Sequence, residues 1–168
     1  AFARESLPWF RELYERDVPW GFIHGDGFLD NTLYDAGPEG APECKLLALV
    51  DWEDSCVGPF VLDLAVSASA CCFTASNELL RQRLVDLVRG YEAARPLLPE
   101  ERGALLDYMA AGALACAFYR FCEFNVRQSD ADPQARDSYR LMFERARELR
   151  SGGGASEVIA SVLQEAAQ

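Results

Sequence analysis

The chain has 168 residues, of which 50% are hydrophobic and 26% are charged, a composition ordinary for one globular domain with a sizeable core. Its formal net charge of -11 makes nucleic acid and anionic membrane surfaces poor partners, because both repel an acidic protein. The same charge would attract a metal ion or a substrate that carries an amino group. We find no signal peptide and no apolar run of bilayer-spanning length, and therefore expect no membrane partner.

The six cysteines form no C-x-x-C pair, and four of them lie in apolar stretches with helical character. We interpret them as reduced, buried, small hydrophobic residues, and we favour packing over a redox role for the adjacent pair Cys71 and Cys72. A reduced state indicates the cytoplasm or a reducing organelle such as a plastid.

The first part of the chain is predicted to alternate short elements with polar loops. A helix is expected from Ser6, as its N-terminal cap, to about Glu15, with Pro8 in its first turn. Residues 18–24 indicate a short extended segment. Residues 31–35 indicate a strand, because their apolar and polar side chains alternate.

A further strand is predicted at residues 45–51, where an almost continuous apolar run is typical of a buried strand. Asp51 ends that strand. The glycines and prolines of residues 35–44 mark the loop before it, and residues 52–60 are expected to be irregular.

The rest of the chain is predicted to be helical. Helices are expected at residues 61–73, 76–95, 99–124 and 132–150. The third is long and apolar in its second half, so we expect it to be central. Asp132 and Pro133 are expected to open the fourth.

The predicted fold class is therefore α+β and mainly α: a small β hairpin element that carries polar loops, followed by a helical bundle. We place residues 1–150 in one domain, with residues 61–150 as its helical part. Residues 151–168 are predicted to be a flexible glycine linker and a loosely attached terminal helix.

One polar loop has the spacing of a phosphotransferase catalytic loop. Residues 24–31, HGDGFLDN, match H-x-D-x-x-x-x-N through His24, Asp26 and Asn31. Asp51 follows one strand later, where protein kinases place the aspartate of D-F-G. Phosphoryl transfer needs a carboxylate that orients the attacking hydroxyl and accepts its proton, and oxygen ligands that hold magnesium against the phosphates. A hairpin built from ordinary turn residues is the weaker alternative.

The stretches HGDGFLDNTLYD and LVDWEDSCVGPFVLDLA resemble the aminoglycoside phosphotransferase/choline kinase family of small-molecule kinases. That family's signatures are an H-G-D-x-x-x-x-N loop, an I-D-[WF]-[ED] strand end and a downstream G-P or D-P…D-L-A segment, and all three are present in order. The D-N ending of the loop, the DLA…CCF helix and YEAARPLLPEER are most similar to the homoserine kinase-like branch. The resemblance extends from about Leu7 to Arg150 and implies the C-terminal lobe of a protein-kinase-like fold.

The resemblance implies a role for each matching residue. Asp26 would be the catalytic base, and Asn31 and Asp51 would be the magnesium ligands. His24 would brace the catalytic loop, and Asp63 would help to hold that loop from the following helix.

Two further carboxylates each have two interpretations. Asp30 would add to an acidic pocket for an amino-bearing substrate, or it would be a plain turn residue. Glu53 lies two residues after Asp51, within the expected metal-binding strand end 51–54. It would approach the metal, although a solvated loop carboxylate is the favoured alternative.

The chain departs from the family pattern in lacking an N-terminal lobe, which in that family is a five-stranded sheet with a phosphate-covering loop and an ATP-gripping lysine. The single lysine, Lys45, lies on the strand that leads to Asp51, which is the wrong place for that grip. We therefore expect one lobe of a longer protein. It would hold a small-molecule acceptor, use Mg2+ and ATP, and have the missing lobe as its partner. Alone it would have little or no kinase activity.

The favoured function is transfer of the ATP γ-phosphate to a hydroxyl of a small, amino-bearing substrate such as homoserine. One alternative is a kinase-like lobe that has lost catalysis and acts as a binding or regulatory module, although the intact Asp26, Asn31 and Asp51 argue against it. Another is a metal-dependent hydrolase on an unrelated α+β fold, which the absence of a second histidine disfavours.

Overall fold

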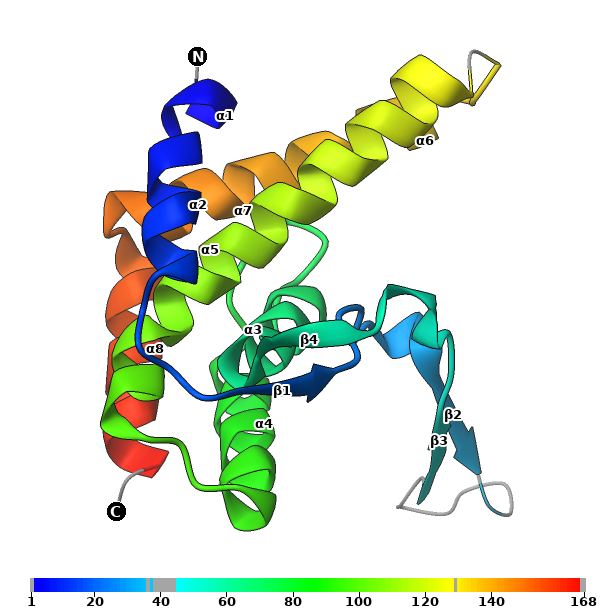
Figure 1. Ribbon diagram of the computed structural model, residues 1–168. Coiled ribbons are helices and arrows are strands. Elements are labelled where there is room, and N and C mark those ends of the chain that lie inside the picture. The colour runs from blue at the N-terminus through cyan, green and yellow to red at the C-terminus, as the bar shows by residue number, and fades with distance from the viewer. Residues whose placement is uncertain (1, 36, 38–44, 129, 167–168) are drawn as a thin grey trace.

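Two small antiparallel sheets precede a bundle of helices in this protein (Figure 1). The computed structural model describes residues 2–35, 37, 45–128 and 130–166. Strand β1 (Trp20–Ile23) pairs with β4 (Cys56–Pro59), and β2 (Thr32–Asp35) pairs with β3 (Lys45–Leu49). The predicted α+β, mainly α fold class is confirmed.

The pairing of the strands differs from the prediction of a single hairpin element. β4 lies inside the segment that we expected to be irregular. It forms because it pairs in register with β1, with Trp20 opposite Pro59 and Ile23 opposite Cys56. Strand formation of this kind depends on a partner distant in sequence, which no local pattern reveals. The candidate catalytic loop consequently joins strands of two different sheets.

β3 is a strand, as predicted, but the prediction that it is buried is wrong. Leu46, Leu47 and Leu49 are 49%, 60% and 44% exposed. The β2–β3 hairpin stands apart from the helices at the right of Figure 1, so the described part of the chain does not cover it. An apolar run marks the strand correctly, but the burial of a strand depends on what packs against it.

The helices enclose one main core. Two short helices, α1 (Phe2–Glu5) and α2 (Leu7–Tyr14), come before β1. The others are α3 (Phe60–Cys71), α4 (Arg81–Ala94), α5 (Pro99–Cys122), α6 (Pro133–Asp137), α7 (Tyr139–Ser151) and α8 (Gly154–Ala166). α5 is central, as predicted, and packs against α3 and α7. Val61, Leu105 and Met109 are fully buried between these helices.

Several helix boundaries differ from those expected. Ser6 occupies the N-cap position of α2, as predicted, but its side chain makes no capping hydrogen bond, and its hydroxyl instead accepts one from Nη1 of Arg150 at 2.8 Å. The second predicted helix begins at Arg81, and Ser138 separates α6 from α7. Asp132 caps α6 as predicted, because its Oδ1 accepts from two backbone N–H groups in the first turn.

The terminal helix α8 is not loosely attached. Gly152 adopts a left-handed conformation with φ 73°, which ends α7 in a tight turn and returns the chain toward α4. Ile159 and Val162 are then fully buried in the main core. Amphipathicity predicted the helix, whereas its docking depends on the apolar face that α4 presents. The boundary at residue 150 stays a prediction about domain organisation.

One helical segment of the described chain, Pro99–Arg127, is long and apolar enough to cross a membrane by length and composition alone. We expected no such segment. It comprises α5 and a π-helical extension, Glu123–Arg127. Its fully buried residues, such as Leu105 and Met109, pack in the core, which accounts for its apolar character.

All the described cysteines are free thiols, but they are less buried than we predicted. Cys72 is buried and Cys56 is exposed, while Cys71, Cys116 and Cys122 are half-buried. Burial raises the pKa of Cys72 to about 12 and also raises that of Cys71. The thiolate forms are therefore disfavoured, which supports packing over a redox role for this pair.

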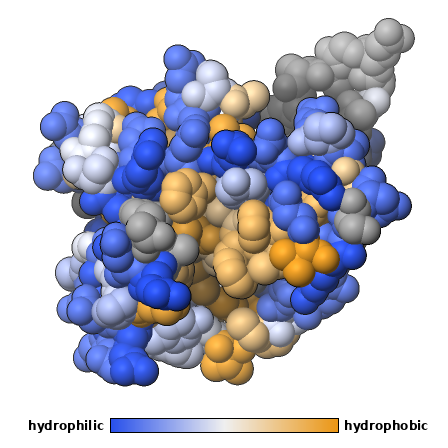
Figure 2. Space-filling view, turned by 90° about the horizontal axis from the view of Figure 1, so that it is seen from above, coloured by the Kyte–Doolittle hydropathy of each residue, from blue (hydrophilic) through white to orange (hydrophobic). Residues whose placement is uncertain are grey.

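Apolar side chains also gather on part of the surface. Figure 2 shows one face on which they surround a hollow and are themselves ringed by hydrophilic side chains. Exposed apolar residues of the β region include Trp20, Phe22 and Val57. Patches of this kind on a protein surface mark sites that bind a ligand or another segment.

Candidate active site

The loop between β1 and β2 is held to the core by one carboxylate. Oδ2 of Asp63 accepts a hydrogen bond from the backbone N–H of His24, and Oδ1 accepts one from Gly25, each at 2.8 Å. Bonds to an ionised acceptor are among the stronger hydrogen bonds in proteins. Because Asp63 belongs to α3, which packs against β1, the loop is fixed to a rigid element.

His24 is buried, and its ring nitrogens have different partners. Nε2 lies 2.9 Å from the carbonyl oxygen of Val50, which can only accept, so Nε2 carries a proton. Nδ1 lies 3.3 Å from the backbone nitrogen of Asp26, which can only donate, so Nδ1 is the acceptor. The ring packs against Trp52 at 4.6 Å between ring centroids. These contacts tie the catalytic loop to the end of β3.

Glycine is required at one position of the loop and is tightly packed at another. Gly25 has φ +85°, and a Cβ there would lie 2.7 Å from the carbonyl oxygen of Asp54. A Cβ at Gly27 would lie 2.2 Å from the hydroxyl oxygen of Ser67 on α3. The loop thus approaches the Asp54 backbone more closely than any other residue type allows, and a side chain at Gly27 would require the Ser67 hydroxyl to move.

Asp26 and Asn31 are in direct contact. The side-chain nitrogen of Asn31 donates to Oδ2 of Asp26 at 2.8 Å and to its carbonyl oxygen at 2.9 Å. The contact forms because a 3-10 turn, Leu29–Asn31, folds the loop back over Asp26. Since the amide nitrogen is used by Asp26, the amide oxygen is the atom of Asn31 that is suited to bind a metal.

Asp51 adopts a left-handed backbone conformation, with φ 65° and ψ 62°, between β3 and the 3-10 turn Trp52–Asp54. Among the described residues, Asn77 is the only other non-glycine with positive φ. Such conformations cost roughly 1–3 kcal/mol, and they gather at functional sites. The turn is held by the indole N–H of Trp52, which donates to the carbonyl oxygen of Leu49 at 3.0 Å.

A cavity of about 410 Å³ opens beside these loops. Asp26, Asp51, Glu53 and Asp54 are among its lining residues. Most of the other lining residues belong to α2, α3 and α5. The cavity therefore places the candidate base next to space for a small molecule, with several carboxylates facing it.

The α5 side of the cavity was not predicted from the sequence. Its lining residues on this helix are Tyr108, Ala111, Gly112, Ala115, Cys116 and Tyr119. Their spacing of three and four residues is one helix face on which small residues lie between two tyrosines. This pattern is visible in the sequence, but a helix face that packs in the core has the same pattern, so it does not identify a cavity wall.

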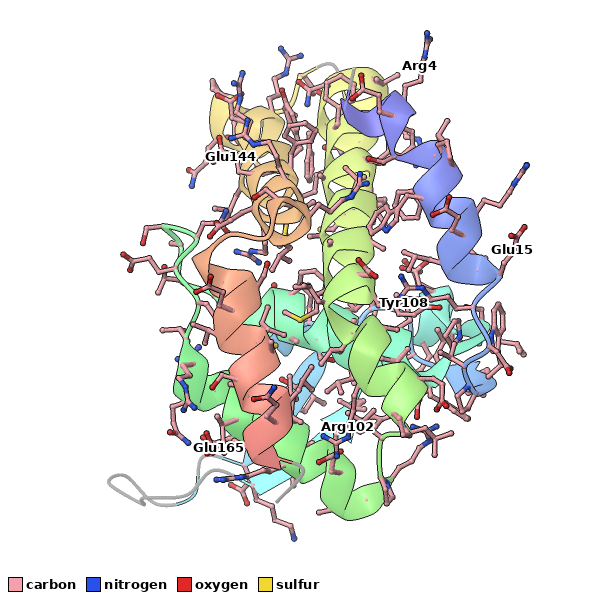
Figure 3. All side chains as sticks on the ribbon, turned by 90° about the vertical axis from the view of Figure 1, so that its left-hand side faces the viewer. Arg4, Glu15, Arg102, Tyr108, Glu144 and Glu165 are labelled. Atoms are coloured by element: carbon pink, nitrogen blue, oxygen red, sulfur yellow. The ribbon has the colours of Figure 1, made fainter. Side chains whose placement is uncertain are left out.

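Tyr108 connects the cavity wall to α2. Its side chain projects from α5 toward the end of α2 (Figure 3), where its hydroxyl donates to the carbonyl oxygen of Leu13 at 2.8 Å. Burial raises the pKa of this phenol, so it stays a neutral donor. The short helix before β1 is therefore part of the site's frame.

Cys116 shares the cavity with the candidate base. Burial raises the pKa of its thiol and is the main cause; the charge of Asp26 acts in the same direction, and the charge of Arg120 opposes both. The thiol is accordingly protonated at neutral pH and is a polar but uncharged part of the wall.

The structure gathers most of the residues singled out from the sequence. Asp26, Asp51 and Glu53 line one cavity, and Asn31 contacts Asp26. His24 and Asp63 lie behind the loop and hold it. Asp30 is exposed on the 3-10 turn and does not line the cavity; the structure therefore does not bring it to the base, because the turn directs Asn31 inward instead.

The residues fit a magnesium ion better than a closed structural metal site. Among the described residues, no group of three His, Cys, Asp or Glu side chains could hold a metal. Magnesium, however, commonly takes only one or two protein oxygen ligands and fills its other positions with water and phosphate oxygens. A carboxylate from Asp51 and an amide oxygen from Asn31 match that requirement.

A carboxylate that accepts from a neighbouring asparagine, with a second aspartate after β3 lining the same cavity, is the arrangement typical of the lobe of a kinase-like phosphotransferase. The sequence model of the phosphotransferase enzyme family matches residues 1–97, which is more than half of the chain. The chain belongs to this family, and its fold is that of a mainly α lobe of the kinase-like type, as the sequence resemblance implied.

Several homoserine kinases are similar to this chain. The homoserine kinase of Methylobacterium radiotolerans is 33% identical over 159 residues, which are 91% of this chain and 47% of that protein. The homoserine kinase of Zymomonas mobilis is 29% identical over 156 residues, 89% of this chain and 46% of that protein. That of Neisseria meningitidis is 31% identical over 112 residues. The chain spans about half the length, or less, of these relatives.

Proposed function

We propose that this chain is the catalytic, acceptor-binding lobe of a small-molecule kinase that transfers the ATP γ-phosphate to a hydroxyl of an amino-bearing substrate such as homoserine. The observation that carries the proposal is the contact between Asp26 and Asn31 beside a cavity that Asp51 also lines. Membership of the phosphotransferase enzyme family and similarity to homoserine kinases support it. The reduced cysteines agree with a cytoplasmic or plastid-like location, which we propose on that ground.

Each residue has a chemical task in this proposal. The carboxylate of Asp26 accepts the proton of the acceptor hydroxyl, and Asn31 holds that carboxylate in place. Asn31 and Asp51 would hold the magnesium ion, which supplies charge neutralisation at the phosphates. His24 and Asp63 keep the loop rigid, so that the base is positioned before the acceptor arrives.

The central test is Asp26→Asn in the longer protein that contains this chain. The amide cannot take the proton, and we expect kcat for phosphate transfer to fall by about 10²–10⁴. The thermal unfolding midpoint should stay within a few degrees of the original. Asp137→Asn, which changes an exposed carboxylate paired with Arg140, is the matched control and should retain activity. Unchanged turnover in Asp26→Asn would remove Asp26 as the base and favour the catalytically lost binding module.

Magnesium binding can be measured separately on the 168-residue chain. Several carboxylates face the cavity, so a bound cation should relieve their repulsion and raise the unfolding temperature by mass action. Asp51→Asn should reduce that shift without disturbing the fold, because Asn tolerates the left-handed conformation at this position. A thermal shift of zero at millimolar magnesium would count against the proposed metal site.

A further inference from the structure

The charges around the cavity are unevenly placed. All four charged residues that line it are acidic: Asp26, Asp51, Glu53 and Asp54. They come from the catalytic loop and the segment after β3. The α5 wall contributes neutral side chains, ending at Cys116 and Tyr119. The lining residues therefore suit an acceptor that carries a positive charge. None of them is a cation that could bind a carboxylate of the acceptor.

Two arginines lie near Cys116, at one end of that neutral wall. Arg120 is four residues after Cys116, so the helical repeat places both on the same face of α5. The charge of Arg120 opposes the effect of burial on the pKa of the Cys116 thiol, so the guanidinium lies near that thiol. Arg145 of α7 also acts on Cys116 electrostatically, and it is only 2% exposed.

Neither arginine has an acidic partner among the described residues. Arg145 is held by neutral groups: Nε donates to Oδ1 of Asn77 at 2.7 Å, Nη1 donates to the carbonyl oxygen of Ser69, and the guanidinium stacks on Phe73. Arg120 has one weak contact, at 3.5 Å, from Nη1 to the carbonyl oxygen of Ser138. Most of the donors of Arg120 are therefore available to another group.

The two guanidinium groups destabilise each other. Burial lowers the pKa of Arg145 to about 10, and the positive charge of Arg120 acts in the same direction. A buried cation without a counter-ion is costly, whereas an anion nearby offsets that cost. An anionic group at the Cys116 end of the cavity would supply the counter-ion that the described residues do not provide.

We propose that Arg120 is a specificity-determining residue that binds the carboxylate of a hydroxy amino acid acceptor. The proposal rests on the kinase function proposed above and adds the acceptor's orientation. The hydroxyl faces Asp26, the ammonium group faces the carboxylates of the cavity, and the carboxylate faces Arg120 past Cys116. Arg145 stays committed to its own partners and adds positive potential. An amino alcohol without a carboxylate makes two of these three contacts.

The test compares two acceptors in the longer protein that contains this chain. L-homoserine has all three groups, and 3-aminopropan-1-ol lacks only the carboxylate. In Arg120→Gln, we expect KM for L-homoserine to rise about 10–100-fold with kcat nearly unchanged, which is the loss expected for one charged hydrogen-bonded contact. KM for 3-aminopropan-1-ol should stay the same. Arg120→Lys should recover part of the affinity for L-homoserine, because it keeps the charge.

Arg127→Gln is the matched control, since Arg127 is exposed beyond the end of α5 and pairs with Glu123. It should alter neither KM. Equal effects of Arg120→Gln on both acceptors, or no effect on either, would overturn the proposal. A partly unfolded variant would lose turnover of both acceptors by the same factor. The ratio of kcat/KM for the two acceptors therefore still tests the proposal. If the unaltered protein phosphorylates neither acceptor, the proposed function itself fails, and this inference fails with it.

Discussion

Asp63 is the single residue on which the geometry of the catalytic loop most depends, because each of its two carboxylate oxygens accepts from a different backbone N–H. The position was readable from the sequence only through the family resemblance, which implied a supporting role. The bonds themselves join residues about forty positions apart, and no local pattern encodes them. His24 illustrates the same limit, since its partner on Val50 belongs to another strand end.

The first prediction at this scale concerns Asp63→Asn. An amide keeps one acceptor oxygen and replaces the other with a donor, which then faces a backbone N–H. We expect the free energy of unfolding, measured by urea denaturation of the 168-residue chain, to fall by about 1–3 kcal/mol. Asp86→Asn, at an exposed position on α4, should change it by less than about 0.5 kcal/mol. Equal effects of the two substitutions would contradict the supporting role of Asp63.

The second prediction compares two glycines. Gly25→Ala introduces a Cβ at φ +85° and within 2.7 Å of a carbonyl oxygen, so it should destabilise the chain by more than about 1 kcal/mol. Gly103→Ala lies in α5 with no atom near the new Cβ, and it should stabilise by about 0.5–1 kcal/mol. Opposite signs in urea denaturation are the expected result. A stabilising Gly25→Ala would show that the loop does not need its left-handed turn.

At the scale of elements, periodicity predicted the helices well and predicted their environment less well. α3 and α5 are buried where continuous apolar character indicated it. β3 has the same apolar character and is exposed, and α8 was expected to be loose and is part of the core. The difference has a physical reason. A hydrophobic pattern predicts which face of an element is apolar, but the burial of that face depends on another element, whose position is set by the whole fold.

The contribution of α8 can be measured directly. Ile159 is fully buried against the core, and Ile159→Ala should lower the free energy of unfolding by about 2–5 kcal/mol. Gln164→Ala, on the exposed face of the same helix, should have little effect. If α8 were only loosely attached, both substitutions would be nearly neutral in urea denaturation.

At the scale of the whole molecule, the described residues place the candidate catalytic groups next to an exposed apolar hairpin, β2–β3. The chain spans 47% of the Methylobacterium radiotolerans homoserine kinase, and its exposed β3 leucines are the kind of surface that another segment covers. We propose that this segment is the N-terminal lobe expected from the sequence resemblance. Catalysis would then depend on positioning that one lobe cannot provide.

The corresponding prediction compares the 168-residue chain with the longer protein that contains it. ATP-dependent phosphorylation of L-homoserine by the isolated chain should be at least about a hundredfold slower, because the phosphates are not held in line with the acceptor. The measurement is phosphate transfer at matched protein concentration and millimolar magnesium. Comparable turnover by the isolated chain would show that this lobe binds ATP unaided, and the expectation of inactivity would be wrong.

The sequence by itself determined most of the helices, the strands β1 to β3, the α+β class and the family, because these follow from periodicity and from a motif with fixed spacing within one loop. It also singled out Asp26, Asn31 and Asp51, of which the first two lie on one loop and the third follows β3. Only the tertiary structure decided the pairing of β1 with β4, the docking of α8 and the α5 wall of the cavity. Those features depend on contacts between distant segments, and a local pattern carries no information about which distant face will meet it.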